Sequence, residues 1–129
     1  MWDKEEQETL YTSAFSLYKQ KSYGQAELLF NQLCLSDPFQ EDFWRGFASC
    51  LQMQLKWKEA IHAWGVLALL KGEDPLPHFH AAECFFSLNE KEEAEKALLQ
   101  VESRLEANTD SDLLSNIILL KELLATRQP

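Results

Sequence analysis

Small and large apolar residues recur along this chain with a period of 34 residues. One column of alanines consists of Ala14, Ala48 and Ala82, and a second column of Ala26, Ala60 and Ala94. A large apolar residue follows each second-column alanine by four positions, at Phe30, Trp64 and Leu98. This period is that of the tetratricopeptide repeat, a helix-turn-helix unit. The alanines are expected to be repeat-packing residues, because two helices approach closely only where their side chains are small.

The same pattern predicts seven helices. They are expected over 8–20, 23–35, 41–54, 57–70, 77–88, 91–106 and 110–126. Pro38 and Gly72 end the first two repeats, and Asp74-Pro75 is a typical helix start. The predicted fold class is all-α: one tetratricopeptide domain over 1–129, with tandem repeats at 7–40, 41–74 and 75–108. The repeats should form a right-handed superhelical array with a concave groove, capped at its open end by the last helix.

In tetratricopeptide folds, fixed positions of the first helix of each repeat face the groove. At these positions the chain offers several aromatic and polar side chains as candidates for binding a peptide or protein cargo. They are Tyr11, Phe15, Tyr18, Lys19, Arg45, Ser49, Gln52, Met53, Phe79, Glu83 and Phe86.

Tyr11, Phe15 and Tyr18 form one stripe on the first helix, because they are spaced i, i+4 and i+7. Such a stripe is usually core. Here Leu10, Ala14 and Leu17 already supply a core face, so the aromatic stripe is expected to face a partner in the groove instead. An exposed aromatic concavity marks an interaction site.

Charge and composition exclude several other classes of function. Twelve Lys and Arg against 21 Asp and Glu give a formal net charge of −9, which disfavours nucleic acid and anionic membranes as partners. The longest apolar run, at 66–70, is far shorter than the roughly 20 residues that span a bilayer, so no direct membrane insertion is expected. Three widely spaced Cys residues suit a reducing cytoplasm better than a disulfide framework.

No pattern of catalytic, cofactor-binding or metal-binding residues is found, so a non-enzyme without a cofactor is predicted. His78 and His80 point away from each other on a helix. His80 and Cys84 could share a face, but Glu83 is expected to face elsewhere, which leaves a zinc site incomplete. A Cys-His nucleophile lacks an orienting acid and an oxyanion hole.

The residues of the first and third repeats resemble a known family, the class II chaperones of bacterial type III secretion systems. The resemblance covers about 10–100. It is carried by Leu10, Tyr11, Ala14, Phe15 and Tyr18, by Tyr23, Ala26, Phe30, Leu33 and Cys34, and most specifically by Phe79-His80-Ala81-Ala82-Glu83-Cys84.

The resemblance implies a chaperone of the secreted translocator (pore-forming) proteins, acting in the cytoplasm of a Gram-negative bacterium. It implies that a short extended cargo segment, of a Pro-x-Leu-x-x-Pro kind, lies in the concave groove. The residues that match the family's aromatic positions in the first repeat are Tyr11, Phe15, Tyr18 and Tyr23, and Phe79 matches a groove aromatic in the third. Family members carry a further helical segment before the first repeat, associated with dimerisation. This chain has ten residues before Tyr11, and a homodimer is one possible assembly.

Two other functions use the same fold. A tetratricopeptide adaptor could bind a C-terminal peptide through a carboxylate clamp, but the clamp positions hold Tyr11, Phe15, Leu76 and His80 instead of Lys, Arg and Asn. A co-chaperone of a needle subunit would hold an amphipathic helix in the groove instead of an extended segment. Binding of an extended against a helical peptide separates this co-chaperone from the translocator chaperone.

Overall fold

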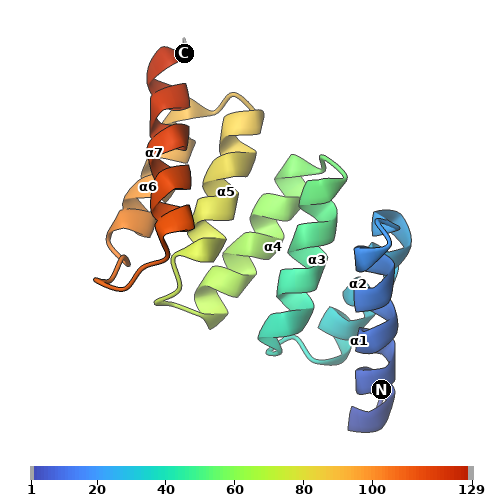
Figure 1. The fold of residues 1–129 in the computed structure, drawn as a ribbon. Helices are drawn as coiled ribbons and strands as arrows, with labels where there is room; N and C mark the ends of the chain where they lie inside the picture. Colours follow the sequence, from blue (N-terminus) through green and yellow to red (C-terminus); the bar gives the residue numbers. More distant parts are fainter. Residues whose placement is uncertain (1, 128–129) are drawn as a thin grey trace.

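A computed structural model describes residues 2–127, and this part of the chain forms seven helices and no strand. They are α1 (Lys4–Lys19), α2 (Tyr23–Ser36), α3 (Glu41–Met53), α4 (Trp57–Leu70), α5 (Leu76–Ser87), α6 (Lys91–Glu102) and α7 (Ser111–Thr126). Three antiparallel hairpins follow one another along the array, and α7 lies at the end opposite α1 (Figure 1). The all-α prediction is confirmed. The repeat boundaries at 7–40, 41–74 and 75–108 stay a prediction.

Helix α1 begins four residues earlier than expected because Asp3 and Glu6 form a capping box. The Asp3 carboxylate accepts from the backbone N–H of Glu6 at 2.8 Å, and the Glu6 side chain accepts from that of Asp3 at 3.1 Å. Two free N–H groups at the start of the helix are thereby satisfied. The sequence carries this signal as Asp-x-x-Glu, ahead of the first repeat.

Helix α6 ends at Glu102, four residues before the predicted end at 106. Arg104 turns back over this end: one nitrogen donates to the carbonyl oxygen of Gln100 at 2.9 Å. Its Nε donates to the carbonyl oxygen of Gly72 at 2.7 Å, which ties the helix end to the loop after α4. These hydrogen bonds replace a further turn of helix.

The turn inside each hairpin has the same backbone geometry. Lys21, Leu55 and Asn89 are 34 residues apart and adopt left-handed φ angles of 65°, 63° and 61°. After each, a 6→1 hydrogen bond closes the helix, as from the N–H of Lys56 to the carbonyl oxygen of Leu51 at 3.0 Å. This is the Schellman motif, which glycine favours most, yet none of the three positions is glycine.

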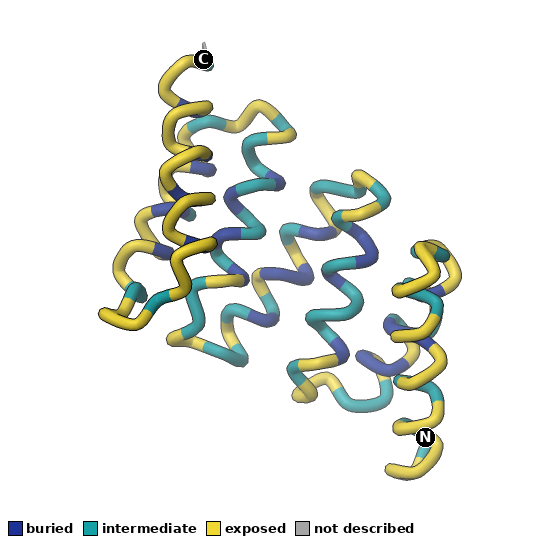
Figure 2. The backbone as a smooth tube through the Cα atoms, in the orientation of Figure 1, coloured by how far each residue is buried: buried dark blue, intermediate teal, exposed yellow. Residues whose placement is uncertain are grey.

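The core consists of three clusters, one for each hairpin, and all six repeat alanines are fully buried in them. The first two clusters include residues of the next hairpin: Phe43 and Cys50 of α3 complete the first, and Cys84 of α5 completes the second. Buried positions accordingly follow the facing sides of the helices (Figure 2). The hairpins are therefore held together by continuous apolar packing.

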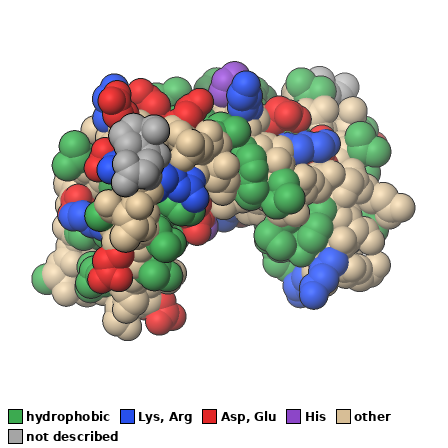
Figure 3. Space-filling model, turned by 90° about the horizontal axis from the view of Figure 1, so that it is seen from above, with side chains coloured by type: hydrophobic (Ala, Val, Ile, Leu, Met, Phe, Trp, Pro, Cys, Tyr) green, Lys and Arg blue, Asp and Glu red, His purple; other side chains and the backbone are tan. Residues whose placement is uncertain are grey.

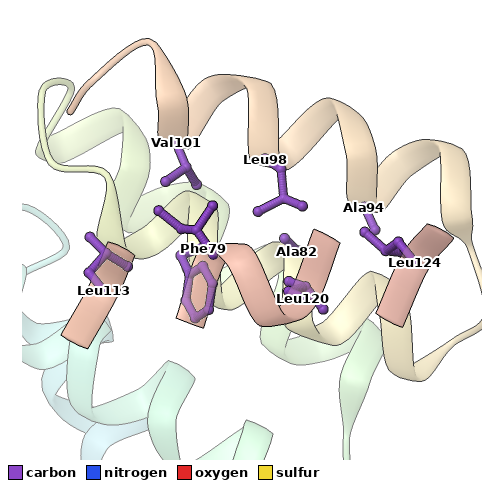
Figure 4. Packing of buried hydrophobic residues seen from close by; sticks show 9 residues of the cluster. Phe79, Ala82, Ala94, Leu98, Val101, Leu113, Leu120 and Leu124 are labelled. Carbon is purple, nitrogen blue, oxygen red and sulfur yellow. The ribbon is translucent and has the colours of Figure 1, made fainter. Parts of the chain in front are cut away.

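The predicted capping role of the last helix matches its packing. The third cluster has no following hairpin, and Leu113, Ile117, Leu120 and Leu124 of α7 cover it instead (Figure 4). They lie against α5 and α6, opposite residues such as Phe79 and Leu98.

Within residues 2–127, none of the helices has the length and apolar character needed to cross a bilayer.

Candidate binding groove

One face of the molecule is hollowed between its two ends, and apolar side chains gather on both sides of the hollow (Figure 3). Two of the pockets in the structure contain most of the predicted groove residues, and the helices α1, α3 and α5 supply most of their walls. The first pocket is lined by Tyr11, Phe15, Tyr18, Phe30, Asp42, Arg45, Gly46 and Ser49. The second pocket is lined by Gln52, Trp57, Phe79, Glu83, Phe86, Ser87, Asn116, Leu119, Leu120 and Leu123.

The aromatic stripe of α1 belongs partly to the core, which corrects the expected division between a core face and a groove face. The ring of Tyr11 lies 5.9 Å from that of Phe30 and 5.7 Å from that of Phe43, both of which are buried. Tyr18 also packs against the first core cluster. Phe15 is 42% exposed and stacks on Tyr11 at 6.1 Å. Phe15 is therefore the member of the stripe that is most available to a partner.

The tyrosine hydroxyls of the first pocket can donate hydrogen bonds. Burial, and then the nearby Asp42 carboxylate, raise the pKa of Tyr11, against the opposing effect of Arg45. Burial also raises the pKa of Tyr18. Both phenols therefore keep their protons at neutral pH, and each can donate to a carbonyl oxygen of a bound chain.

Two cations flank the first pocket. The Nζ atom of Lys19 lies 4.8 Å from the centre of the Phe15 ring, close enough for a cation–π interaction. The guanidinium of Arg45 forms an ion pair with the Asp42 carboxylate at 2.7 Å. Both groups are accessible to solvent, so a partner can reach them.

The second pocket has a wall that the sequence analysis missed. Leu119, Leu120 and Leu123 come from α7, which was expected only to cap the array. Leu119 is 54% exposed and Leu123 is 43% exposed. The sequence could have predicted this second apolar face, since α7 has more apolar residues than one buried face needs.

Some predicted groove residues have other roles. Phe79 is only 5% exposed and belongs to the third core cluster, so it forms the floor of the second pocket and not a free anchor. Phe86 lines the pocket, while the guanidinium of Arg127 stacks on its ring at 3.7 Å. Met53 is exposed at the end of α3 and lines neither of the two pockets.

A chain of hydrogen bonds crosses from α4 through α3 to α5 beside the second pocket. Trp64 Nε1 donates to Gln52 Oε1 at 2.8 Å, and Gln52 Nε2 donates to Glu83 Oε1 at 3.2 Å. His80 Nδ1 lies 2.8 Å from the same Glu83 oxygen, and the His80 ring stacks on Trp64 at 4.5 Å. The expectation that Glu83 faces away from His80 is therefore wrong, because one helical turn brings the two side chains together.

Burial makes the three cysteine thiols unreactive. Burial raises the pKa of Cys34, Cys50 and Cys84 to about 12 in each case. A thiol with so high a pKa is protonated at neutral pH and is a poor nucleophile or metal ligand. In the part of the chain that the structure describes, no three His, Cys, Asp or Glu side chains are grouped so as to hold a metal ion.

Comparison with known proteins places the chain in a family. No family model matches the sequence. Low calcium response locus protein H of Yersinia pestis is 32% identical over 124 residues, which covers 90% of this chain and 74% of that protein. The chain belongs to the family of this protein. Members of the family are tetratricopeptide chaperones of type III secretion.

Solved structures of this family share the whole architecture. The type III secretion chaperone SycD of Yersinia enterocolitica, in complex with a peptide of the translocator YopD, is 29% identical, with a TM-score of 0.88 over 95% of each chain. The alternative dimer of the same SycD is also 29% identical, with a TM-score of 0.86 over 95% of this chain and 94% of that one. The family resemblance seen in the sequence is thereby confirmed.

Proposed function

We propose that this protein is a type III secretion chaperone that holds a translocator segment in an extended form along its concave groove. The observation that carries the proposal is the pair of apolar pockets on the hollow face of the molecule. The fold that forms these pockets is shared with the chaperone SycD. The family supports a chaperone role, which needs no catalytic residue. The related SycD is itself complexed with a translocator peptide.

The groove suits an extended segment with spaced apolar anchors. Phe15 in the first pocket, and Leu119 and Leu123 in the second, expose apolar surface that a partner can cover. Each apolar side chain buried there contributes roughly 1.5–3 kcal/mol, part of which is lost in ordering the segment. Two such anchors give roughly 3–6 kcal/mol before these costs, and micromolar binding needs about 8 kcal/mol, so hydrogen bonds and further contacts along the groove must supply the rest.

The protein is proposed to act in the bacterial cytoplasm, where a translocator must be kept soluble before export. Three buried free thiols are compatible with a reducing compartment. The net charge of −9 keeps a complex with an apolar cargo in solution. A homodimer is proposed as one assembly state, and sedimentation equilibrium of the free chain and of the complex measures it.

The test is co-expression with the translocators encoded in the same gene cluster, followed by co-purification and titration with the protected cargo segment. Phe15→Ala with Leu123→Ala should weaken binding at least about tenfold, because each removes an exposed anchor of one pocket. The melting temperature should fall less than for a core residue such as Leu120, since Phe15 is 42% exposed and Leu123 is 43% exposed. Replacement of Tyr11 is a poorer test, because its ring also packs on Phe30 and Phe43.

A matched control is Leu69→Ala, which truncates a leucine that is 86% exposed on α4 and lines neither pocket. It should bind cargo like the wild type. Binding of an amphipathic helix but of no extended segment would indicate the needle-subunit co-chaperone instead. Failure of every translocator to bind the folded protein would overturn the proposal.

A further inference from the structure

The two pockets of the groove differ in charge. The first pocket has an ion pair between Arg45 and Asp42, with Lys19 as a further cation beside Phe15. Among the residues lining the second pocket, Glu83 alone is charged, and its side chain is 39% exposed. The first pocket thus has Lys19 as a cation beyond its ion pair, while the second pocket has the Glu83 carboxylate on its wall and Arg127 on the ring of Phe86.

The hydrogen-bond chain holds the Glu83 carboxylate in a fixed position. The indole N–H of Trp64 can only donate, so it sets the orientation of the Gln52 amide, with Oε1 towards Trp64 and Nε2 towards Glu83. A carboxylate can only accept, so the Nδ1 atom of His80 carries the proton in their contact. Both donors reach the same oxygen of Glu83, Oε1.

The other carboxylate oxygen, Oε2, is left for a partner. Within residues 2–127, neither a hydrogen bond nor an ion pair reaches Glu83 Oε2. The nearby cation Arg127 is engaged elsewhere, stacked on Phe86 and donating to the carbonyl oxygen of that residue. A preorganised carboxylate with one free oxygen, on the wall of an apolar pocket, is a receptor for a cationic donor.

We propose that Glu83 binds a Lys or Arg side chain of the translocator segment, next to the apolar residue in the second pocket, and so fixes the direction of the segment. The inference rests on the proposed function. At the first pocket, by contrast, Lys19 beside Phe15 would repel a basic side chain. Attraction at one pocket and repulsion at the other both favour a single direction.

The experiment uses three fluorescent peptides built on one Pro-x-Leu-x-x-Pro core: one with Lys before the core, one with Lys after it, and one with no Lys. Anisotropy titrations should show one Lys peptide binding about three- to fivefold more tightly than the other, as expected for one partly exposed ion pair. Glu83→Gln should abolish this preference. The neutral peptide, titrated against the same variant, measures any general change in groove affinity, so the preference is read as the ratio of the two Lys peptides.

The matched control is Glu92→Gln, which removes the same charge from an exposed position on α6 and should keep the preference. In the wild type, the preference should shrink as the salt concentration rises from about 0.05 to about 0.5 M. Equal binding of the two Lys peptides, or a preference that persists in Glu83→Gln, would overturn the inference while the neutral peptide still reports the chaperone function. If none of the three peptides binds, the proposed function fails, and this inference with it.

Discussion

Gly46 is a residue at which the packing of the first pocket leaves no room for a side chain. A Cβ atom there would lie 2.2 Å from Cε1 of Phe30, whose ring is 1% exposed. Gly46→Ala should therefore destabilise the fold by about 1–3 kcal/mol through overpacking. Thermal unfolding should show a melting temperature lower by several degrees.

The control for this substitution is Gly65→Ala within α4, where a new Cβ meets nothing within 4 Å. It should stabilise the helix by about 0.5–1 kcal/mol, because Ala loses less backbone entropy than Gly. A melting temperature of Gly46→Ala that matches or exceeds that of the wild type would contradict the packing described here.

His78 makes stability depend on pH. Desolvation by burial, and then the nearby Arg104, lower its pKa below the ordinary 6.5, and Asp74 only partly opposes them. Between the folded and unfolded pKa values the unfolded state binds more protons, so stability should fall as pH drops below about 6.5. His78→Leu should make this loss smaller, as measured by urea unfolding from pH 7.5 down to 5.

Exposed His62 on α4 supplies the comparison for the pH measurement. His62→Leu measures how far the loss of an exposed imidazole alone changes the pH slope. A slope that is the same for His78→Leu and the wild type would show that burial of His78 does not contribute.

At the scale of the elements, the turns between paired helices hold non-glycine residues in a strained left-handed backbone conformation, and a glycine there would relieve the strain. Leu55 has a φ angle of 63°, which costs a residue with a Cβ roughly 1–2 kcal/mol, and its side chain is 66% exposed. Leu55→Gly should therefore stabilise the protein by about 1 kcal/mol. Chemical denaturation measures the change.

The equivalent position in the third hairpin is Asn89, with a φ angle of 61°. Asn tolerates the left-handed region, so Asn89→Gly should change stability less than Leu55→Gly does. A destabilised Leu55→Gly would indicate that the leucine side chain, not the backbone, dominates at this turn.

At the scale of the whole molecule, stability is shared between neighbouring hairpins and α7. Leu120 is 6% exposed in the third core cluster, between α7 and the last hairpin. Leu120→Ala should cost about 2–5 kcal/mol. Because each hairpin contacts only its neighbours, hydrogen exchange should rise first in α5, α6 and α7, and α1 and α2 should keep their protection longest. A uniform rise along the chain would instead show fully cooperative unfolding.

The groove was only partly predictable from the sequence. The repeat register places Phe15, Arg45, Ser49 and Glu83 on the inner helices, and the structure brings all four to the two pockets. The register could not foresee Leu119 and Leu123, because α7 lies outside the repeats and its position depends on how it packs on α5 and α6. Nor does it separate Phe79, which is buried, from Phe15, which is exposed.

The sequence by itself determined the all-α class, the hairpin repeat and the capping helix. These follow from local signals: alanines at a period of 34 residues, proline and capping residues at helix ends, and an apolar last helix. The tertiary structure decided which apolar face of each helix became core and which became groove, and it brought Trp64, Gln52, Glu83 and His80 into one hydrogen-bond chain. The reason is physical: burial and side-chain pairing depend on which helices meet, and a one-dimensional period does not contain those contacts.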